Sequence, residues 1–255
     1  MARIFITGSS DGLGFLAGKA LIDQGHEVVL HARNAQRAQA TKERLPKCRD
    51  IVVGDVSTLA VIKNIAHQIN AMGPFDAVIH NVGLGDREAR VETEDGVTQI
   101  FAVNVLTPYV LTALITPPER LIYLGSDMHA RGDPGLDDPQ WQTRRWDSYA
   151  AYSDTKLYDV TLAMYLARQW PGKFINAVDP GWVPTRMGGA TAPDDLAQGA
   201  ATQAWLAVSD DPAAKVTGRY LYHKKPQRMN PVAAREDVQA RLVEYLRGVT
   251  GVELG

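Results

Sequence analysis

The chain has 255 residues, of which 45% are hydrophobic and 22% are charged, a composition that excludes global disorder. Its 27 basic and 29 acidic side chains give a formal net charge of −2, which offers no electrostatic case for nucleic-acid binding. The single cysteine, Cys48, excludes an intramolecular disulfide and fits a reducing compartment.

Short apolar runs alternate with helical periodicity along the whole chain. The runs are expected to form strands at residues 3–7, 27–31, 50–53, 76–80, 120–124, 173–178 and 219–223. The intervening stretches are expected to form helices at residues 13–24, 35–45, 59–72, 97–114, 149–169, 196–208 and 236–247. Continuously apolar strands joined through helices are typical of a parallel sheet covered on both faces. The sequence therefore predicts one α/β domain over residues 1–255, a doubly wound parallel sheet of about seven strands.

Two irregular segments, residues 127–147 and 181–195, follow predicted strands. The first is polar and holds two tryptophans, and the second holds Pro184 and Pro193. Both should lie over the carboxyl edge of the sheet, where such folds bind ligands, so we expect them to be substrate loops. Plain surface loops are the alternative for each.

Signals for membranes and metals are missing from the sequence. The apolar run at residues 4–6 is too short for the core of a signal peptide, and no stretch approaches the ~20 apolar residues that cross a bilayer. The six histidines are scattered, and no Cys/His cluster has the spacing of a metal site. We therefore expect a cytoplasmic protein with no membrane span and no metal.

The first predicted strand runs into a glycine-rich turn, Thr7-Gly8-Ser9-Ser10-Asp11-Gly12-Leu13-Gly14. Glycines allow a tight turn and the close approach of a pyrophosphate to the backbone. The helix that begins near Leu13 would present free N–H groups and the positive end of its dipole to that anion. The position of the turn, after a strand and before a helix, favours dinucleotide binding over a plain turn with capping serines.

A tyrosine and a lysine, Tyr152 and Lys156, stand four residues apart on a predicted helix, which puts them on one face about 6 Å apart along the axis. At 4 Å and an effective dielectric near 20, an ammonium and a phenolate interact by about 4 kcal/mol, or roughly three pKa units. We therefore expect the pKa of Tyr152 to fall from about 10 towards neutrality, where proton transfer is useful. Tyr149 is not activated in this way, because Ser153 stands four residues after it. An isolated pair of this kind is usually structural.

The spacing T-G-x-x-x-G-x-G, together with Y-x-x-x-K, resembles the short-chain dehydrogenase/reductase family over about residues 3–223. The resemblance implies a Rossmann fold and an oxidoreductase that transfers hydride between a nicotinamide and a carbonyl or alcohol. Trp146, Tyr149, Tyr152 and Lys156 form W-x-x-Y-x-x-Y-x-x-x-K, which looks like the retinol-dehydrogenase-like branch.

The resemblance also implies a catalytic set of four residues, Ser126, Asn104, Tyr152 and Lys156. Ser126 would orient and polarise the substrate oxygen, and Tyr152 would transfer the proton. Lys156 would lower the pKa of the tyrosine and hold the nicotinamide ribose, and Asn104 would hold a water of a proton relay. A turn serine and a buried amide at a helix kink are the structural alternatives for Ser126 and Asn104.

The cofactor site implied by the resemblance comprises Gly8, Ser9, Ser10, Gly12, Leu13, Gly14, Arg33, Asp55, Val56, Asn81, Gly83, Tyr152, Lys156, Pro180, Gly181, Val183 and Thr185. Residues 80–83 read H-N-V-G where the family has N-N-A-G, so only Asn81 and Gly83 carry over. The second strand ends in His31-Ala32-Arg33-Asn34, without the acid that would favour NAD. Because Arg33 can pair with a 2′-phosphate, NADP(H) is favoured, with NAD(H) and a solvated surface arginine as alternatives. Asp11 would disfavour that phosphate if its charge pointed inward.

Substrate and assembly are less specified by the sequence. Met128, Trp141, Trp182 and Met187 would either line an apolar pocket for a hydrophobic aldehyde or ketone, or pack the two loops onto the core. Family members are often dimers or tetramers that use the helix of Tyr152, so a homodimer or homotetramer is a further expectation. Two rival classes stay open: a non-catalytic NADP(H)-binding regulatory protein, and a scaffold on a relic enzyme fold that binds no nucleotide.

Overall fold

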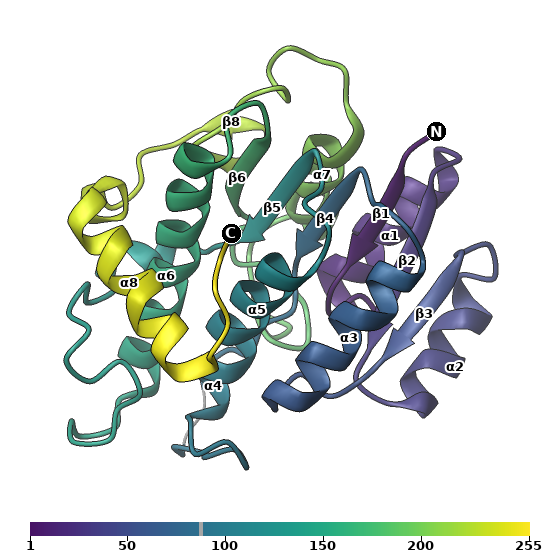
Figure 1. Ribbon diagram of the computed structural model, residues 1–255. Helices are drawn as coiled ribbons and strands as arrows, with labels where there is room; N and C mark the ends of the chain where they lie inside the picture. Colours follow the sequence, from purple (N-terminus) through teal and green to yellow (C-terminus); the bar gives the residue numbers. More distant parts are fainter. Residues whose placement is uncertain (87–88) are drawn as a thin grey trace.

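The computed structural model describes residues 1–86 and 89–255, and its centre is a twisted sheet of eight strands (Figure 1). The strands are β1 (Arg3–Ile6), β2 (Glu27–Ala32), β3 (Asp50–Val53), β4 (Ala77–His80), β5 (Arg120–Leu124), β6 (Phe174–Asp179), β7 (Arg219–Tyr222) and β8 (Lys225–Pro226). Their order across the sheet is β3-β2-β1-β4-β5-β6-β7-β8, and only β8 is antiparallel. The predicted doubly wound parallel sheet is therefore confirmed.

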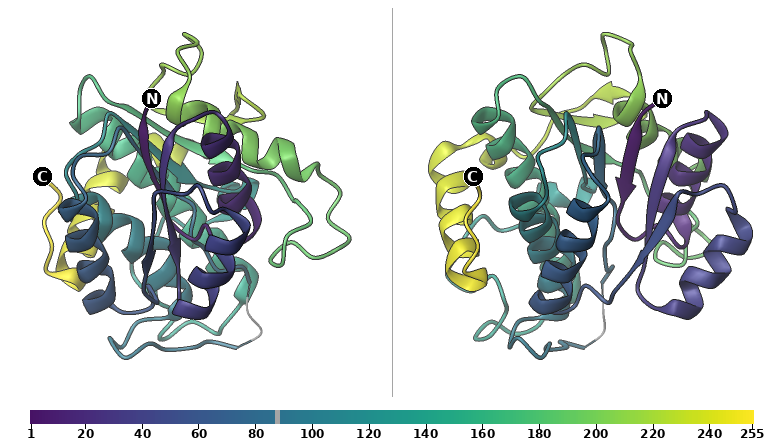
Figure 2. Two further views of the ribbon diagram at one scale, coloured as in Figure 1. Left: turned by 90° about the vertical axis from the view of Figure 1, so that its right-hand side faces the viewer. Right: turned by 45° about the vertical axis from the view of Figure 1, so that its right-hand side comes forward.

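Helices cover both faces of this sheet (Figure 2). Their bounds are α1 (Gly12–Asp23), α2 (Ala35–Arg44), α3 (Leu59–Ala71), α4 (Gln99–Phe101), α5 (Thr107–Leu114), α6 (Ser148–Gln169), α7 (Leu196–Val208) and α8 (Glu236–Thr250). α1 and α7 pack into the core of one face, and α3, α5 and α6 into the core of the other. α8 lies on the outer side of α6, so the chain itself covers that side of the helix that carries Tyr152 and Lys156.

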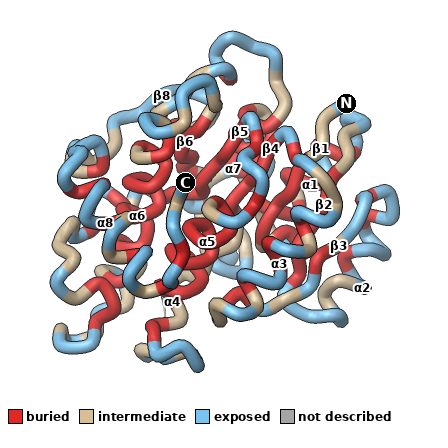
Figure 3. Tube along the Cα trace, viewed as in Figure 1, coloured by how far each residue is buried: buried red, intermediate tan, exposed pale blue. Residues whose placement is uncertain are grey.

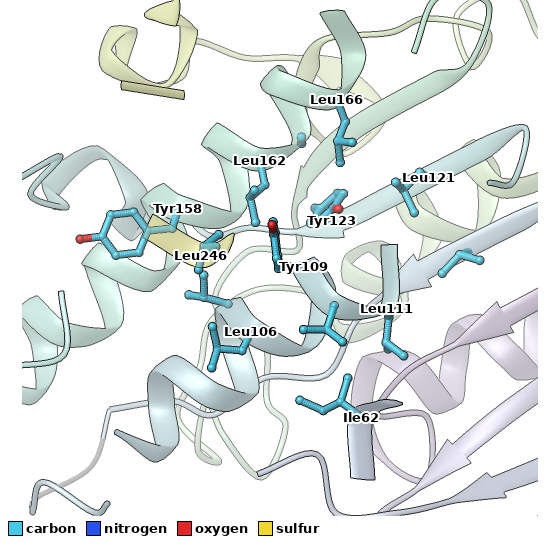
Figure 4. Close-up of a cluster of buried hydrophobic side chains, with 14 of the residues drawn as sticks. Ile62, Leu106, Tyr109, Leu111, Leu121, Tyr123, Tyr158, Leu162, Leu166 and Leu246 are labelled. Atoms are coloured by element: carbon cyan, nitrogen blue, oxygen red, sulfur yellow. The ribbon is translucent and has the colours of Figure 1, made fainter. Parts of the chain in front are cut away.

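Strand periodicity explains the two cores. Successive side chains of a strand point to opposite faces, so Ile4 and Ile6 of β1 join one core and Phe5 joins the other. The larger core draws on helices far apart in sequence, with Tyr109, Leu162 and other large side chains meeting over β5 (Figure 4). The buried trace in Figure 3 follows the strands and the inner faces of the helices, as expected for apolar runs enclosed by two layers.

One predicted helix, residues 97–114, is interrupted. α4 passes into a π-helical segment, η1 (Ala102–Leu106), before α5 begins. Pro108 has no N–H to offer the carbonyl of Asn104 four residues earlier, so a regular α-helical bond is impossible there. A π-helical turn inserted in a helix often marks a functional position.

The strand β8 was absent from the prediction. It pairs with β7 through a tight turn in which His223 and Lys224 adopt positive φ values of 47° and 64°. Neither residue is a typical turn former, so the sequence carries no signal for this hairpin. The two irregular segments contain further short structure, including the 3-10 helix η2 (Asp127–Arg131). No helix of the described residues is long and apolar enough to cross a bilayer.

Candidate active site

A cleft of about 650 Å³ opens beside the ends of the parallel strands and reaches from the glycine turn to α6. It brings together many of the residues expected to bind a cofactor, namely Gly8, Ser10, Gly12, Leu13, Arg33, Asp55, Val56, Asn81, Gly83, Tyr152, Lys156, Pro180 and Thr185. The others, which do not line it, are Ser9, Gly14, Gly181 and Val183, and the same holds for Asn104 and Ser126. The glycine turn and the tyrosine–lysine pair thus share one cleft.

The glycine turn is held against the end of β4 by Asn81. Its side-chain amide donates to the carbonyl oxygens of Thr7 and Gly8 at 3.0 and 2.9 Å, and the Thr7 hydroxyl accepts from the Asn81 N–H at 2.9 Å. Gly8 has a φ of 61°, and a Cβ on it would lie 2.7 Å from the Cα of Val82. A Cβ on Gly14 would lie 2.4 Å from the Asn81 amide nitrogen. Side chains at these two positions would collide with the segment after β4, so glycine is needed for the turn to pack this closely against it.

His31, at the end of β2, also fixes this turn. The Gly8 N–H donates to its Nδ1 at 2.9 Å, and its Nε2 donates to the Gly54 carbonyl at 2.9 Å. A backbone N–H can only donate, so Nδ1 carries no proton and the imidazole is neutral. Burial lowers the pKa of His31, in agreement with a neutral ring. This link between β1, β2 and β3 was not predicted, because the sequence does not show which groups meet across the sheet.

Two arginines line the mouth of the cleft beside the glycine turn, the expected Arg33 and the unexpected Arg37. The side chain of Asn34 accepts from the Arg37 N–H at 2.9 Å and caps α2. The Arg37 guanidinium reaches to 3.5 Å from the hydroxyl of Ser10. Asp11 is engaged by the first N–H of α1, that of Gly12, at 2.9 Å and is exposed to solvent. Both guanidinium groups thus line the cleft, as does the exposed carboxylate of Asp11.

Tyr152 and Lys156 lie one turn apart on α6, as predicted, and the Lys156 Nζ is 5.8 Å from the centre of the Tyr152 ring. The ammonium donates to the Leu124 carbonyl at 2.8 Å and to the Asp159 carboxylate at 2.9 Å. A Cβ on Gly83 would lie 3.8 Å from Nζ, so the ammonium borders the cleft beside the segment that follows β4. Tyr152 and Lys156 both line the cleft, and the ammonium of Lys156 also forms an ion pair with Asp159.

The expected fall in the pKa of Tyr152 is wrong for this structure. The Lys156 charge does lower it, and so does a hydrogen bond with the Ser126 side chain. Burial outweighs both, because a phenolate is poorly solvated at this depth, and the nearby carboxylates of Asp159 and Asp179 act in the same direction as burial. The net effect raises the pKa of Tyr152 above its ordinary value, so the phenol is protonated at neutral pH.

Ser126 follows β5 and caps η2. Its hydroxyl accepts from the Met128 N–H at 3.2 Å, which confirms a turn role beside its link to Tyr152. Its carbonyl accepts from Nδ1 of His129 at 2.6 Å, and the His129 Nε2 accepts from the Asn230 N–H at 3.0 Å. Because the latter N–H can only donate, His129 is neutral with its proton on Nδ1. A buried imidazole therefore fixes the backbone of Ser126.

Asn104 is buried within η1 and ties the segment after β4 to α6. Its side-chain amide accepts from the Leu84 N–H at 2.7 Å and donates to the Leu84 carbonyl at 3.0 Å. It also donates to the Thr155 hydroxyl at 3.0 Å. The side chain is thus occupied by protein groups, while its backbone carbonyl lacks the regular helical donor that Pro108 cannot supply.

The segment after β6 closes the cleft on a third side. Gly181 has a φ of 77°, and its N–H donates to the Asp179 carboxylate at 2.9 Å. Val183 is buried, whereas Thr185 lines the cleft and lies 3.5 Å from where a Cβ on Gly12 would stand. This segment therefore folds back over the glycine turn.

The four apolar residues considered for a substrate pocket are separated. Met187 lines the cleft and is 51% exposed. Trp182 is 58% exposed, and its indole N–H donates to the Gly188 carbonyl at 2.8 Å. Trp141 is buried in its own loop, where it packs edge-on against Trp146. Of the four, Met187 alone lines the cleft, and the tryptophans stabilise their loops.

Comparison with known proteins fits this arrangement. The short chain dehydrogenase family model matches residues 2–120. The chain is 42% identical to an uncharacterized oxidoreductase of Emericella nidulans, over 99% of this chain and 98% of that protein. It is 39% identical to a short-chain dehydrogenase of Gibberella zeae, over 100% and 99% of the two chains. A glycine-turn cleft with a tyrosine–lysine pair defines a nucleotide-dependent oxidoreductase class, and the chain belongs to the short-chain dehydrogenase/reductase family.

More distant similarities extend the comparison. Human retinol dehydrogenase 13 is 29% identical over 98% of this chain and 85% of its own length. Among solved structures, an uncharacterized protein from Mycobacterium paratuberculosis has a TM-score of 0.87 at 22% identity, covering 100% of this chain and 95% of that one. A short chain dehydrogenase from Shigella flexneri, solved with NADP, has a TM-score of 0.65 at 23% identity, covering 88% and 97%. These structures share the fold.

Proposed function

We propose that the protein is an NADP(H)-dependent oxidoreductase that interconverts a carbonyl and an alcohol, with Tyr152 as the general acid and base. The observation that carries this proposal is that Tyr152 and Lys156 line the same cleft as the glycine turn. A nucleotide held at the turn and a substrate oxygen at Tyr152 can then meet inside about 650 Å³.

The residues of the cleft suit a dinucleotide. The glycine turn lines the cleft through Gly8, Ser10 and Gly12 and runs directly into the N-terminal end of α1, which suits the binding of a phosphate. Arg33 and Arg37 offer two guanidinium groups and β2 ends without an acid, which favours the 2′-phosphate of NADP(H) over NAD(H). Short chain dehydrogenases of similar fold have been solved with NADP, which supports the same choice.

The catalytic residues then have separate tasks. When bound, NADPH supplies the hydride. Ser126 orients the substrate oxygen, and the protonated Tyr152 donates a proton to it. Lys156 holds positive charge beside the phenol and stabilises the tyrosinate that this step leaves behind. The backbone carbonyl of Asn104 has no regular helical donor, because Pro108 lacks an N–H, so it is suited to hold a water that returns a proton to Lys156.

The raised pKa of Tyr152 fits the reductive direction. A proton donor must be protonated before it acts, and the raised pKa keeps the phenol protonated at neutral pH and further into the alkaline range. The substrate side of the cleft includes apolar groups such as Leu84, Val103 and Met187, so a small carbonyl compound with an apolar body is the proposed substrate class.

NADPH consumption and NADPH binding test this function together. Wild-type protein is offered a panel of aliphatic and aromatic aldehydes and ketones while absorbance at 340 nm is followed, and NADPH and NADH are titrated by fluorescence. We expect tight NADPH binding and consumption with at least one carbonyl. Tight binding without consumption across the panel would favour a regulatory protein. The absence of any nucleotide binding would favour a scaffold.

A further inference from the structure

A buried carboxylate, Asp159, faces Lys156 from the next turn of α6. The two side chains form an ion pair of 2.9 Å and are 4% and 6% exposed, respectively. The other carboxylate oxygen of Asp159 is buried without a hydrogen-bond partner among the described residues. Lys156 is therefore the principal partner of this carboxylate, and nothing in the proposed proton transfer yet requires an acid there.

We propose that Asp159 is a positioning residue that keeps the Lys156 ammonium charged and fixed beside Tyr152. The inference rests on the proposed function only for its consequence in catalysis, because the ion pair itself is a property of the folded chain. The carboxylate and the Leu124 carbonyl occupy two of the three donors of the ammonium, at 2.9 and 2.8 Å. The third N–H of the Lys156 ammonium therefore remains available to a group bound in the cleft.

The electrostatic reason is the cost of burying a cation. Burial alone disfavours a charged lysine and is the largest influence on Lys156. The charge of Asp159, followed by the charge of Tyr152 and then by the hydrogen bond to Asp159, reverses that effect, and together they raise the pKa of Lys156 above its ordinary value. Without Asp159, a nearly fully buried amine would tend to lose its proton.

Two other titratable groups lie near the ion pair of Lys156 and Asp159. Tyr123 on β5 has its pKa raised by the charge of Asp159, and Asp179 at the end of β6 raises the pKa of Tyr152. Among the described residues, no charged group of α8, η2 or η3 (Pro231–Ala234) contributes to the pKa of either Lys156 or Asp159. Among the groups that favour the charged form of Lys156, Asp159 therefore makes the largest contribution.

Asp159 also limits how strongly the lysine acidifies the tyrosine. Tyr152 experiences an ammonium paired with a carboxylate, and that carboxylate raises the pKa of the phenol. The consequence is a donor that stays protonated next to a lysine that stays charged. Loss of the carboxylate should narrow the pH range of reduction from its alkaline side, because either Lys156 or Tyr152 then loses its proton at lower pH.

Direct titration of Lys156 tests the proposal without substrate or nucleotide. The protein is labelled with lysine carrying ¹³C at Cε, the Lys156 signal is identified by its loss in Lys156→Arg, and its midpoint is followed by NMR. In Asp159→Asn we expect this midpoint to fall by about one pH unit or more. Asp159→Glu, which keeps the charge, should stay much closer to wild type. It also serves as the folded comparison if the Asn variant is unstable.

Asp154→Asn is the matched control. Asp154 is a buried carboxylate of the same helix that accepts from Arg144 at 3.1 Å and does not contact Lys156. Its loss should leave the Lys156 midpoint in place. An unchanged midpoint in Asp159→Asn, or an equal fall in Asp154→Asn, would overturn the proposal whatever the outcome of the activity assays.

The pH dependence of carbonyl reduction is the second test of the role of Asp159. With NADPH and an aromatic aldehyde such as 4-nitrobenzaldehyde, the alkaline limb of kcat/KM should move to lower pH in Asp159→Asn and return in Asp159→Glu. A uniform loss at every pH would indicate a merely structural role and contradict the inference. No reduction by the wild type would count against the proposed function and leave the NMR result to decide the role of Asp159.

Discussion

The side-chain amide of Asn104 donates to the hydroxyl of Thr155, 3.0 Å away, and so joins the π-helical segment after β4 to the helix of Tyr152 and Lys156. The Thr155 hydroxyl in turn donates to the Tyr152 carbonyl at 2.8 Å. The position of α6 is thus coupled to the wall of the cleft through one buried amide.

Asn104→Ala should therefore weaken both the fold and the site. It leaves the N–H and carbonyl of Leu84 without their side-chain partner, and an unsatisfied buried polar group costs about 1–3 kcal/mol. We expect the free energy of unfolding to fall by about 2 kcal/mol or more in urea titrations. Thr155→Val removes the hydroxyl that accepts from Asn104 and donates to the Tyr152 carbonyl, but it keeps the bonds between Asn104 and Leu84, so it should cost about half as much. Equal stability of Asn104→Ala and wild type would refute this coupling.

The two arginines at the cleft mouth should select the nucleotide. A charge-assisted hydrogen bond is worth about 1.5–3 kcal/mol, so Arg33→Ala combined with Arg37→Ala should weaken NADPH binding roughly tenfold or more while NADH binding changes little. Arg44→Ala is the control on α2, because its guanidinium lies 3.7 Å from the Phe15 ring centre and does not line the cleft. Parallel losses for NADPH and NADH would show that the arginines do not read the 2′-phosphate.

A methyl group at Gly14 should abolish the nucleotide site. The Cβ would come within 2.4 Å of the Asn81 amide and 2.8 Å of the Gly8 carbonyl, so Gly14→Ala must displace the turn. We expect NADPH affinity to fall beyond detection in fluorescence titrations. Gly248→Ala provides the comparison, since that glycine lies in α8 with open space around it. It should retain NADPH binding and gain about 0.5–1 kcal/mol of stability.

Acid should destabilise the protein through His80. The ring lies at the end of β4, its Nε2 is 2.9 Å from the Thr112 hydroxyl, and burial lowers the pKa to about 3. Because the unfolded chain binds the proton first, with a pKa near 6.5, this stability is complete above that value and is lost as the pH falls towards 3. Between pH 7.5 and 5.5, His80 should account for a loss of about 1.4 kcal/mol.

Urea titrations of His80→Asn at the two pH values check this prediction. The variant should lose less stability on acidification than wild type, by about that amount. An identical pH dependence in both proteins would assign the acid sensitivity to other groups, such as the buried His31 and His129, whose pKa values burial also lowers.

Patterns local in sequence were sufficient for much of this molecule. The seven parallel strands were predictable from apolar runs, and the pairing of Tyr152 with Lys156 from helical spacing. Asp159 was equally visible three residues after Lys156, on the same face. Arg37 was also accessible to this reasoning, because Asn34 is a typical helix cap and places it in the first turn of α2.

Contacts between distant segments could not be predicted in the same way. The imidazole of His31 joins Gly8 to Gly54, and nothing in its own sequence neighbourhood indicates either partner. The expected acidity of Tyr152 failed for a related reason. It considered the single charge of Lys156, whereas burial and the carboxylates of two separate elements decide the balance.

The substitution Tyr152→Phe tests the central claim most directly. Phenylalanine keeps the ring but removes the only proton that the residue can donate, so NADPH affinity should stay within about twofold of wild type while NADPH-dependent carbonyl reduction falls at least about a hundredfold. Reduction at a rate close to that of wild type, with NADPH still bound, would contradict the assignment of Tyr152 as the proton donor.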